Sequence, residues 1–441
     1  MRKAGARIQE DIFRIHSDSF VELCRGCNSS AFTRNRKMPS DDLLFSMINR
    51  RGLTLHMELR EYMKISHPGT QISKPGYLKQ RMKLNPEAFV DLFHHHNKNF
   101  YSDPDTKPYN YRGYLMLAAD GSSINIPTTP ETLEAYGTCS NHKSRPIATL
   151  GLQGLYDVLN RMIIEADCCR SKYNEAQVAE EQFSRLENTI GELPYITIMD
   201  RAYPSMPFII RLVRKKTYFV MRLKASDFKS EQNSMKNNDG DIEIILSKER
   251  KRHYEGTKDW ELMCSVDSFN LRFVKVWLDD KNFEVLATNL PRDQFEEDCF
   301  KEIYHMRWGI ETAFLELKNR LQMENFTGTK PILLEQDIYS TIYVCNIAED
   351  IARDAEKEQK DHYENDYKHR MAINRSVCIG ILKNDLIYIL LEPDPSVQDE
   401  LFENIYREIS NNIVPIRPDR HYERQKGNFA GKYSNTNKRG F

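Results

Sequence analysis

The spacing of apolar residues divides the chain into parts, and the first part is predicted to be helical. Up to about residue 108, apolar positions recur every three or four residues, as in DDLLFSMINRRG at 41–52 and NPEAFVDLFHHHNKNF at 85–100. This is the period of a helix with one buried face. The stretch 101–113, YSDPDTKPYNYRG, is rich in proline and tyrosine and indicates a linker. We therefore predict a helical N-terminal domain over residues 1–108.

From Tyr114 the pattern becomes that of strands alternating with helices. Strand-like runs lie at 114–119, 123–127, 147–157 (with 161–166 continuing the meander), 195–200 and 217–224, and helical patterns lie at 174–188 and 206–216. Three consecutive strands followed by helix, strand, helix and strand predict an α/β domain, which we place at 109–326.

A segment at about 225–282 interrupts this domain. It opens with the polar loop KSEQNSMKNNDGD and continues with the short runs IEIIL, WELMCSV and LRFVKVWL. We interpret all three runs as strands and the segment as a β-rich insertion. The α/β pattern resumes at 283–290, FEVLATNL, and a long helix carrying residues 304–318 follows.

Helical patterns return in a C-terminal region at 327–416. Its apolar segment Ile379–Leu391 is suited equally to packing within the chain and to dimerisation. The remaining tail, 417–441, holds seven Lys or Arg against two acidic residues. A tail of this composition is either solvated or in contact with DNA or a partner.

Four polar residues share one face of the long helix in YHMRWGIETAFLELKNRL. Tyr304, Arg307, Glu311 and Lys318 fall at roughly 0°, 300°, 340° and 320° around a helix that turns about 100° per residue. They therefore form a stripe about 60° wide beside an apolar arc. A carboxylate flanked by a phenol, a guanidinium and an ammonium is suited to holding a metal ion and gripping phosphates. A solvated surface helix is the alternative.

Two aspartates end strand-like runs upstream of this helix. Asp120 closes YLMLAAD and Asp200 closes YITIMD. A single aspartate at the end of a strand is usually a turn or cap residue. Two of them together with Glu311 on the striped helix could instead hold two Mg²⁺, with Mn²⁺ as a substitute, for phosphodiester chemistry.

This combination resembles the DDE transposases of bacterial insertion sequences. The features that match are the order Asp120, Asp200, Glu311, the Asp-Arg-Ala-Tyr at 200–203, and Tyr-x2-Arg-x3-Glu-x6-Lys around Glu311. The last signature, with a β-rich insertion before the glutamate, is similar to the hairpin-forming cut-and-paste group. The resemblance implies a ribonuclease-H-like core with helical flanks, catalysis by the three carboxylates, and phosphate contacts from Tyr304, Arg307 and Lys318. It also implies that the partners are the double-stranded DNA of element ends and target, and a second copy on paired ends.

Further DNA contacts are expected outside the triad. A basic helix beginning at Ser73 would present Lys74, Lys79, Arg81 and Lys83 to a groove, or else to solvent. Arg201 and Tyr203 beside Asp200 either position substrate or pack the turn. Trp308 is close enough to the stripe to touch DNA. We prefer Trp277 to Trp260 and Trp308 as the candidate platform for a base flipped out during hairpin formation. A tryptophan buried in the core is the commoner case for each of the three.

Composition excludes several classes of protein. The 441 residues carry a net charge of -1, so DNA affinity must come from local patches. No apolar run is long enough for a secretion signal or a membrane span, and nine cysteines without disulfide-like spacing favour a reducing cytoplasm. The single pair Cys24 and Cys27 is more typical of two partly buried free thiols than of zinc ligands. The run His94–His96 is more typical of an exposed helix end than of a metal site. A metal-dependent nuclease without strand transfer and a non-enzymatic DNA-binding descendant remain alternatives.

Overall fold

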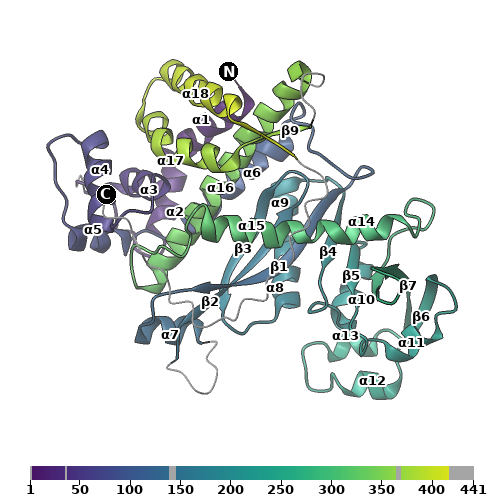
Figure 1. Cartoon of the computed structure of the whole chain (residues 1–441). Helices are drawn as coiled ribbons and strands as arrows, with labels where there is room; N and C mark the ends of the chain where they lie inside the picture. Colours follow the sequence, from purple (N-terminus) through teal and green to yellow (C-terminus); the bar gives the residue numbers. More distant parts are fainter. Residues whose placement is uncertain (1, 35–36, 139–145, 364–368, 417–441) are drawn as a thin grey trace.

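An eight-stranded mixed sheet lies at the centre of the computed structural model, which describes residues 2–34, 37–138, 146–363 and 369–416 (Figure 1). The strand order is β3-β2-β1-β4-β5-β8-β7-β6. The strands are β1 Leu115–Asn125, β2 Thr149–Asp157, β3 Met162–Arg170, β4 Tyr195–Met199, β5 Tyr218–Arg222, β6 Asp239–Ile245, β7 Ser268–Trp277 and β8 Phe283–Thr288; β9 Met371–Ile373 and β10 Ile413–Pro415 form a separate pair. Strands β1, β2 and β3 are antiparallel, while β1, β4 and β5 are parallel. The predicted ribonuclease-H-like core is confirmed.

Helices cover both faces of this sheet and form both flanks of the chain. The N-terminal helices are α1 Lys3–Ile15, α2 Asp18–Arg25, α3 Ser40–Ile48, α4 Leu55–Ser66, α5 Lys74–Arg81 and α6 Glu87–Ser102. Those between strands are α7 Pro130–Tyr136, α8 Glu175–Arg185, α9 Glu187–Ile190, α10 Met206–Arg214, α11 Lys229–Ser234, α12 Lys248–Arg252 and α13 Trp260–Cys264. The last are α14 Cys299–Met306, α15 Trp308–Asn319, α16 Pro331–Tyr363, α17 Arg375–Leu391 and α18 Pro395–Asn411. Among the described residues, none of these helices is both long and apolar enough to cross a bilayer.

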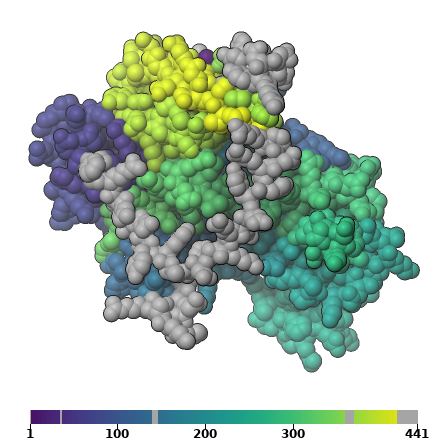
Figure 2. Space-filling view, in the orientation of Figure 1, coloured from purple at the N-terminus to yellow at the C-terminus, as the bar shows by residue number. Residues whose placement is uncertain are grey.

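The insertion differs from its prediction in two respects. It contains three short helices, α11, α12 and α13: the polar loop contains α11, and the run WELMCSV, predicted as a strand, contains α13. Its two strands do not form a separate sheet. Strands β6 and β7 extend the core sheet through β8, which pairs antiparallel with β5 (Figure 1). The insertion therefore continues the edge of the catalytic sheet, and in the space-filling view it forms the teal lobe at the lower right (Figure 2).

The helical N- and C-terminal regions share one hydrophobic core. Buried residues of α1, α3 and α6 join those of α16, α17 and α18 in a single cluster, which also includes one face of β1 and β2. Figure 2 shows the purple N-terminal helices against the green and yellow C-terminal ones. The apolar segment Ile379–Leu391 lies within α17 and is buried against this core. Its apolar surface is thus explained by packing within the chain and does not by itself indicate a dimer.

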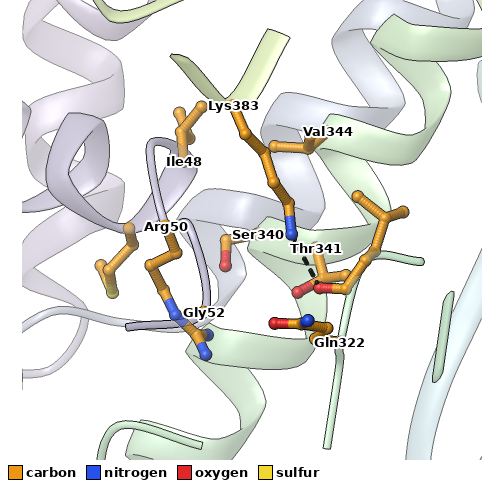
Figure 3. A pocket seen from close by; sticks show the side chains of 10 residues that line it. Ile48, Arg50, Gly52, Gln322, Ser340, Thr341, Val344 and Lys383 are labelled. Atoms are coloured by element: carbon orange, nitrogen blue, oxygen red, sulfur yellow. Dashed lines mark hydrogen bonds between the residues drawn. The ribbon is translucent and has the colours of Figure 1, made fainter. Parts of the chain in front are cut away.

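The end of α15 is fixed at the junction of these flanking regions. Arg50 donates to the carbonyl of Asn325, whose side-chain amide donates to the carbonyl of Gly52 at 3.0 Å. From the opposite side, Lys383 of α17 donates to the carbonyl of Leu321 at 3.1 Å across a pocket of about 20 Å³ (Figure 3). Burial, with the nearby charge of Arg50, lowers the pKa of Lys383 to about 8. Residues of the N-terminal and C-terminal helical regions therefore both hold the segment that follows the helix carrying Glu311.

The predicted basic helix exists as α5, which ends at Arg81 and so leaves Lys83 just beyond it, and one of the four predicted cations is not available to DNA. Ser73 caps it as expected, with its Oγ accepting from the Gly76 N–H at 3.2 Å. Arg81, however, is completely buried. It donates to Asp337 at 2.8 Å and to Gln336 at 2.9 Å, and also to Thr327. The prediction that Arg81 contacts DNA is therefore wrong, because burial turned this cation into the partner of an interior carboxylate.

A second buried network ties α1 to α6 and α16. His95 and His96 both face Asp11 of α1, at 2.8 and 2.7 Å. Asp11 also accepts from the Tyr343 hydroxyl at 3.0 Å. Burial lowers the pKa of His96, but Asp11 and Asp350 outweigh it and raise the pKa to about 9. The histidine run is thus an interior connection and not the exposed helix end that we predicted.

Removing the Arg81 side chain should destabilise the protein strongly. In Arg81→Ala the buried Asp337 keeps, among the described residues, only Arg50 as an ionic partner, at 3.0 Å. Breaking a buried pair on one side costs roughly 3–5 kcal/mol. Urea unfolding measures this, with the exposed Lys79→Ala as the control, whose change should stay within about 0.5 kcal/mol. Equal stability of the two variants would contradict a structural role for Arg81.

Candidate active site

Asp120 and Asp200 lie at the same level of the sheet because of strand register. Parallel pairing joins β1 to β4 from Leu115 opposite Tyr195 to Ala119 opposite Met199. Asp120 directly follows Ala119 and Asp200 directly follows Met199, so the two aspartates come just after the last paired residues. Strand β1 continues as one strand past Asp120, where two runs were predicted, whereas β4 stops at Met199. The two carboxylates therefore stand where the sheet loses a strand and opens on that side of β1.

Helix α15 brings Glu311 to this opening through close packing on β2. Gly154 is paired with Asp120 on the neighbouring strand. A Cβ at Gly154 would lie 3.0 Å from the ring of Phe314 and 3.6 Å from Ile310. The missing side chain lets α15 settle against the sheet directly beside Asp120. The predicted long helix is in fact two helices, α14 and α15, separated by one turn residue at Arg307.

Arg307 bridges two of the three carboxylates. One of its Nη atoms lies 3.4 Å from Oδ2 of Asp120 and the other 2.7 Å from Oε1 of Glu311. The guanidinium lies between the rings of Tyr304 and Trp308, with its carbon 5.8 and 5.0 Å from their centroids. Only 8% of the Arg307 side chain is exposed, so this is a protein cation held in a partly desolvated acidic site.

The electrostatics at Asp120 show an excess of negative charge. Burial, with smaller contributions from the charges of Asp200 and Glu175, raises its pKa to about 7 against the opposing effects of the Gly121 N–H and Arg307. Asp200 accepts from the N–H of Ala202 at 2.7 Å. One protein cation thus offsets several carboxylates, and such a site favours additional positive charge.

The rest of the stripe follows β1 away from Asp120. Lys318 donates to the hydroxyl of Ser122 and to the carbonyl of Ser123, both at 2.8 Å. Tyr304 is buried in the core beneath β4 and β5, where its ring supports Arg307. Trp308 is 43% exposed beside Arg307. The structure therefore brings the four stripe residues to one edge of β1, with Tyr304 largely buried beneath the surface.

The turn after Asp200 separates a structural residue from an exposed one. Tyr203 is fully buried, and its hydroxyl accepts from the side-chain amide of Gln153 at 2.8 Å, so it packs the turn. Gln153 in turn accepts from the hydroxyl of Tyr173 at 2.9 Å. Arg201 is exposed beside Asp200.

Trp277 lies at the same end of the sheet as the aspartates. It is paired with Phe283 at the β7–β8 hairpin, beyond the carboxyl end of β5, where Arg222 is paired with Leu286. It is 44% exposed and packs on the Phe283 ring at 5.2 Å. Trp260, on α13, is partly buried.

One acidic residue near the site escaped the sequence analysis. Glu175, the first residue of α8, acts electrostatically on both Asp120 and Asp200. In the sequence it is one of several acidic residues of an amphipathic helix, and it ends no strand. The only signal available was its position just after the third strand of the core.

The carboxylates suit a divalent cation in donor chemistry, since Asp and Glu oxygens are the ligands that Mg²⁺ prefers. The Arg307 cation that bridges Asp120 and Glu311 supports this, because it stands in for positive charge at the same oxygens. Among the described residues, however, no three acidic, histidine or cysteine side chains are close enough together to surround an ion. In this arrangement the guanidinium of Arg307 contacts both Asp120 and Glu311.

Comparison with known proteins shows similarity to one family of enzymes. The family described as transposase DDE domain matches residues 111–347, more than half of the chain. The transposase InsG of insertion sequence element IS4 from Escherichia coli K12 is 20% identical over 340 residues, covering 74% of this chain and 73% of that protein. A putative transposase InsL of element IS186A from the same organism is 30% identical over 67 residues, 15% of this chain and 18% of that protein.

Among solved structures, a piggyBac transposase synaptic complex with hairpin DNA aligns with 94% of this chain and 88% of its own, at 11% identity and a TM-score of 0.47. The family match spans both aspartates, Glu311 and the whole insertion. The chain belongs to the DDE transposase family, whose members cut and transfer DNA strands.

Proposed function

We propose that this transposase binds the terminal inverted repeats of its own insertion sequence, excises the element by metal-dependent hydrolysis and joins the freed 3′ ends to target DNA. The observation that carries this proposal is the arrangement of Asp120, Asp200 and Glu311 around the end of β4, with Arg307 bridging two of them. Two Mg²⁺ held by these residues would activate the attacking oxygen and stabilise the leaving oxygen.

Each side chain of the stripe has a separate role in this proposal. Arg307 turns from Asp120 and Glu311 to a phosphate of the bound strand, which its planar fork can hold through two hydrogen bonds. Lys318 supplies a point charge further along β1. Tyr304 supports the guanidinium from below. Exchange of Arg307 from carboxylates to phosphate would couple DNA binding to assembly of the metal site.

Recognition of the element's ends is assigned to α5. Lys74 and Lys79 are exposed and Lys83 is partly so, which leaves a basic surface after Arg81 is removed from the set. Mobility shift with end DNA tests this assignment. Lys74→Ala with Lys79→Ala should weaken specific binding and leave folding unchanged, and unaltered binding would move recognition to another region.

The basic tail 417–441, a second DNA-binding candidate, lies outside the described residues. A homodimer on paired ends is retained from the family resemblance.

We assign the second strand cut to a hairpin intermediate, with Trp277 as the stacking platform. Its exposure and its place at the aspartate end of the sheet support this choice. Trp308, equally exposed but packed on Arg307, is assigned to backbone contact. A nuclease without strand transfer would need neither the insertion nor the phosphate-gripping stripe, and the retained carboxylates argue against a non-enzymatic descendant.

Conservative removal of any of the three carboxylates should abolish cleavage without unfolding the protein. Asp120→Asn, Asp200→Asn and Glu311→Gln are each expected to lower the rate of Mg²⁺-dependent cleavage of end DNA at least about a thousand-fold, since a positioned cation contributes several kcal/mol to the transition state. Gel assays measure cleavage, and circular dichroism with mobility shift supplies the controls. Normal cleavage by Asp200→Asn would contradict the site.

The tryptophan variants separate nicking from hairpin formation. Trp277→Ala should retain the first strand nick but lose hairpin product, since base stacking contributes about 1–3 kcal/mol. Trp308→Ala is the matched variant, with 43% exposure against 44%, and should still form hairpins. Denaturing gels resolve the two products. Loss of hairpin in Trp308→Ala alone would transfer the platform to that residue.

A further inference from the structure

A buried chain of hydrogen bonds crosses β1 on the face of the sheet away from α15. Its central member is Gln153 of β2, which is completely buried. The amide nitrogen of Gln153 donates to the hydroxyl of Tyr203 at 2.8 Å, and the amide oxygen accepts from the hydroxyl of Tyr173 at 2.9 Å. An amide offers both a donor and an acceptor, so one side chain serves both tyrosines. The chain connects β2 with the loop before α8 and with the turn after β4.

Missing side chains on β1 and β2 make room for this chain. Gly121 of β1 is paired with Gln153. A Cβ built on Gly121 would overlap the Tyr173 hydroxyl, and one built on Gly151 would lie 2.6 Å from the Tyr173 ring. Neighbouring residues of a strand face opposite sides, and Gly154, next to Gln153, packs against α15. The hydrogen-bond chain therefore lies on the opposite side, where α8 covers the sheet.

Asp200 lies beyond the paired part of its strand. Asp120 is held within β1 by its pairing with β2, whereas the pairing of β4 with β1 ends one residue before Asp200. Within its own turn Asp200 accepts from a backbone N–H at 2.7 Å. Tyr203, three residues further on, is fully buried and joins this turn to Gln153, two strands away in the sheet. The bond between Tyr203 and Gln153 thus ties the turn that carries Asp200 to the strand that pairs with Asp120.

We propose that Gln153 and Tyr203 are positioning residues, which hold the carboxylate of Asp200 beside Asp120 before a cation binds. This inference rests on the proposed metal-dependent function. Residues that support metal ligands from behind influence metal affinity although they do not touch the metal. The alternative role is purely structural, in which the side chains of the chain only satisfy one another's hydrogen bonds beneath the sheet.

Mn²⁺ binding to the full-length protein, measured by calorimetry without DNA, separates the two roles. Tyr203→Phe removes the hydroxyl, keeps the ring and should weaken Mn²⁺ binding about ten-fold. Tyr343→Phe is the matched control, because Tyr343 is also fully buried and its hydroxyl donates to Asp11 at 3.0 Å, outside the catalytic sheet. This control should bind Mn²⁺ within about two-fold of the unaltered protein, since distant sites act independently.

A double variant distinguishes positioning from stability. Gln153→Leu with Tyr203→Phe replaces both partners of the bond by apolar groups, whereas Tyr203→Phe alone leaves a buried amide nitrogen without its acceptor. The double variant should therefore unfold at a higher temperature than Tyr203→Phe and still bind Mn²⁺ about ten-fold more weakly than the unaltered protein. It also supplies the comparison should Tyr203→Phe not fold. Recovery of both the melting temperature and the Mn²⁺ affinity would overturn the proposal.

The outcomes distinguish this inference from the function on which it rests. Unaltered Mn²⁺ affinity in Tyr203→Phe, with loss in Asp200→Asn, would overturn the positioning role and leave the three carboxylates in place. Equal weakening in Tyr203→Phe and Tyr343→Phe would also overturn it, because it would indicate a general loosening of the fold. Absence of saturable Mn²⁺ binding in the unaltered protein would overturn both the inference and the proposed function.

Discussion

The accumulation of negative charge at the end of β4 is the constraint on which the active site depends. Strand register sets Asp120 beside Asp200, and helices on the two faces add Glu311 and Glu175. Burial, together with the charges of Asp200 and Glu175, raises the pKa of Asp120 to about 7. Arg307 offsets part of this charge through its ion pairs with Asp120 and Glu311.

The remainder of the fold holds these charges in place against their repulsion. Glycines at 154 and 121 let α15 and the Glu175 carboxylate approach β1 and β2 within contact distance. The segment that follows α15 is anchored at Asn325 by Arg50 and Gly52 and at Leu321 by Lys383, so residues of both flanking regions hold it. Helix α16 runs through the shared core and binds Arg81 through Asp337. Flanking regions that look like separate domains in the sequence therefore act as the support of the catalytic helix.

Much of this arrangement could be predicted because it is encoded locally. Apolar runs ending in Asp120 and Asp200 gave the strands, and the helical period placed Arg307 and Glu311 on one face. Other features depended on tertiary contacts. Helices α11 and α13 have six and five residues, too few for a periodic pattern to develop, so the first was interpreted as a polar loop and the second as a strand. In the sequence Arg81 looks like its exposed basic neighbours. Its burial depends on a tertiary contact with Asp337, which lies 256 positions away.

The central claim is that Asp120, Asp200 and Glu311 bind the catalytic cation. Replacing Mg²⁺ by Fe²⁺ with ascorbate and peroxide tests it most directly, because hydroxyl radicals formed at the bound ion cut the nearby backbone. The account predicts discrete protein fragments from cuts near residues 120, 200 and 311, suppressed by excess Mg²⁺ and absent in Asp120→Asn. Fragments mapping elsewhere, or the same cuts persisting in Asp120→Asn, would contradict it.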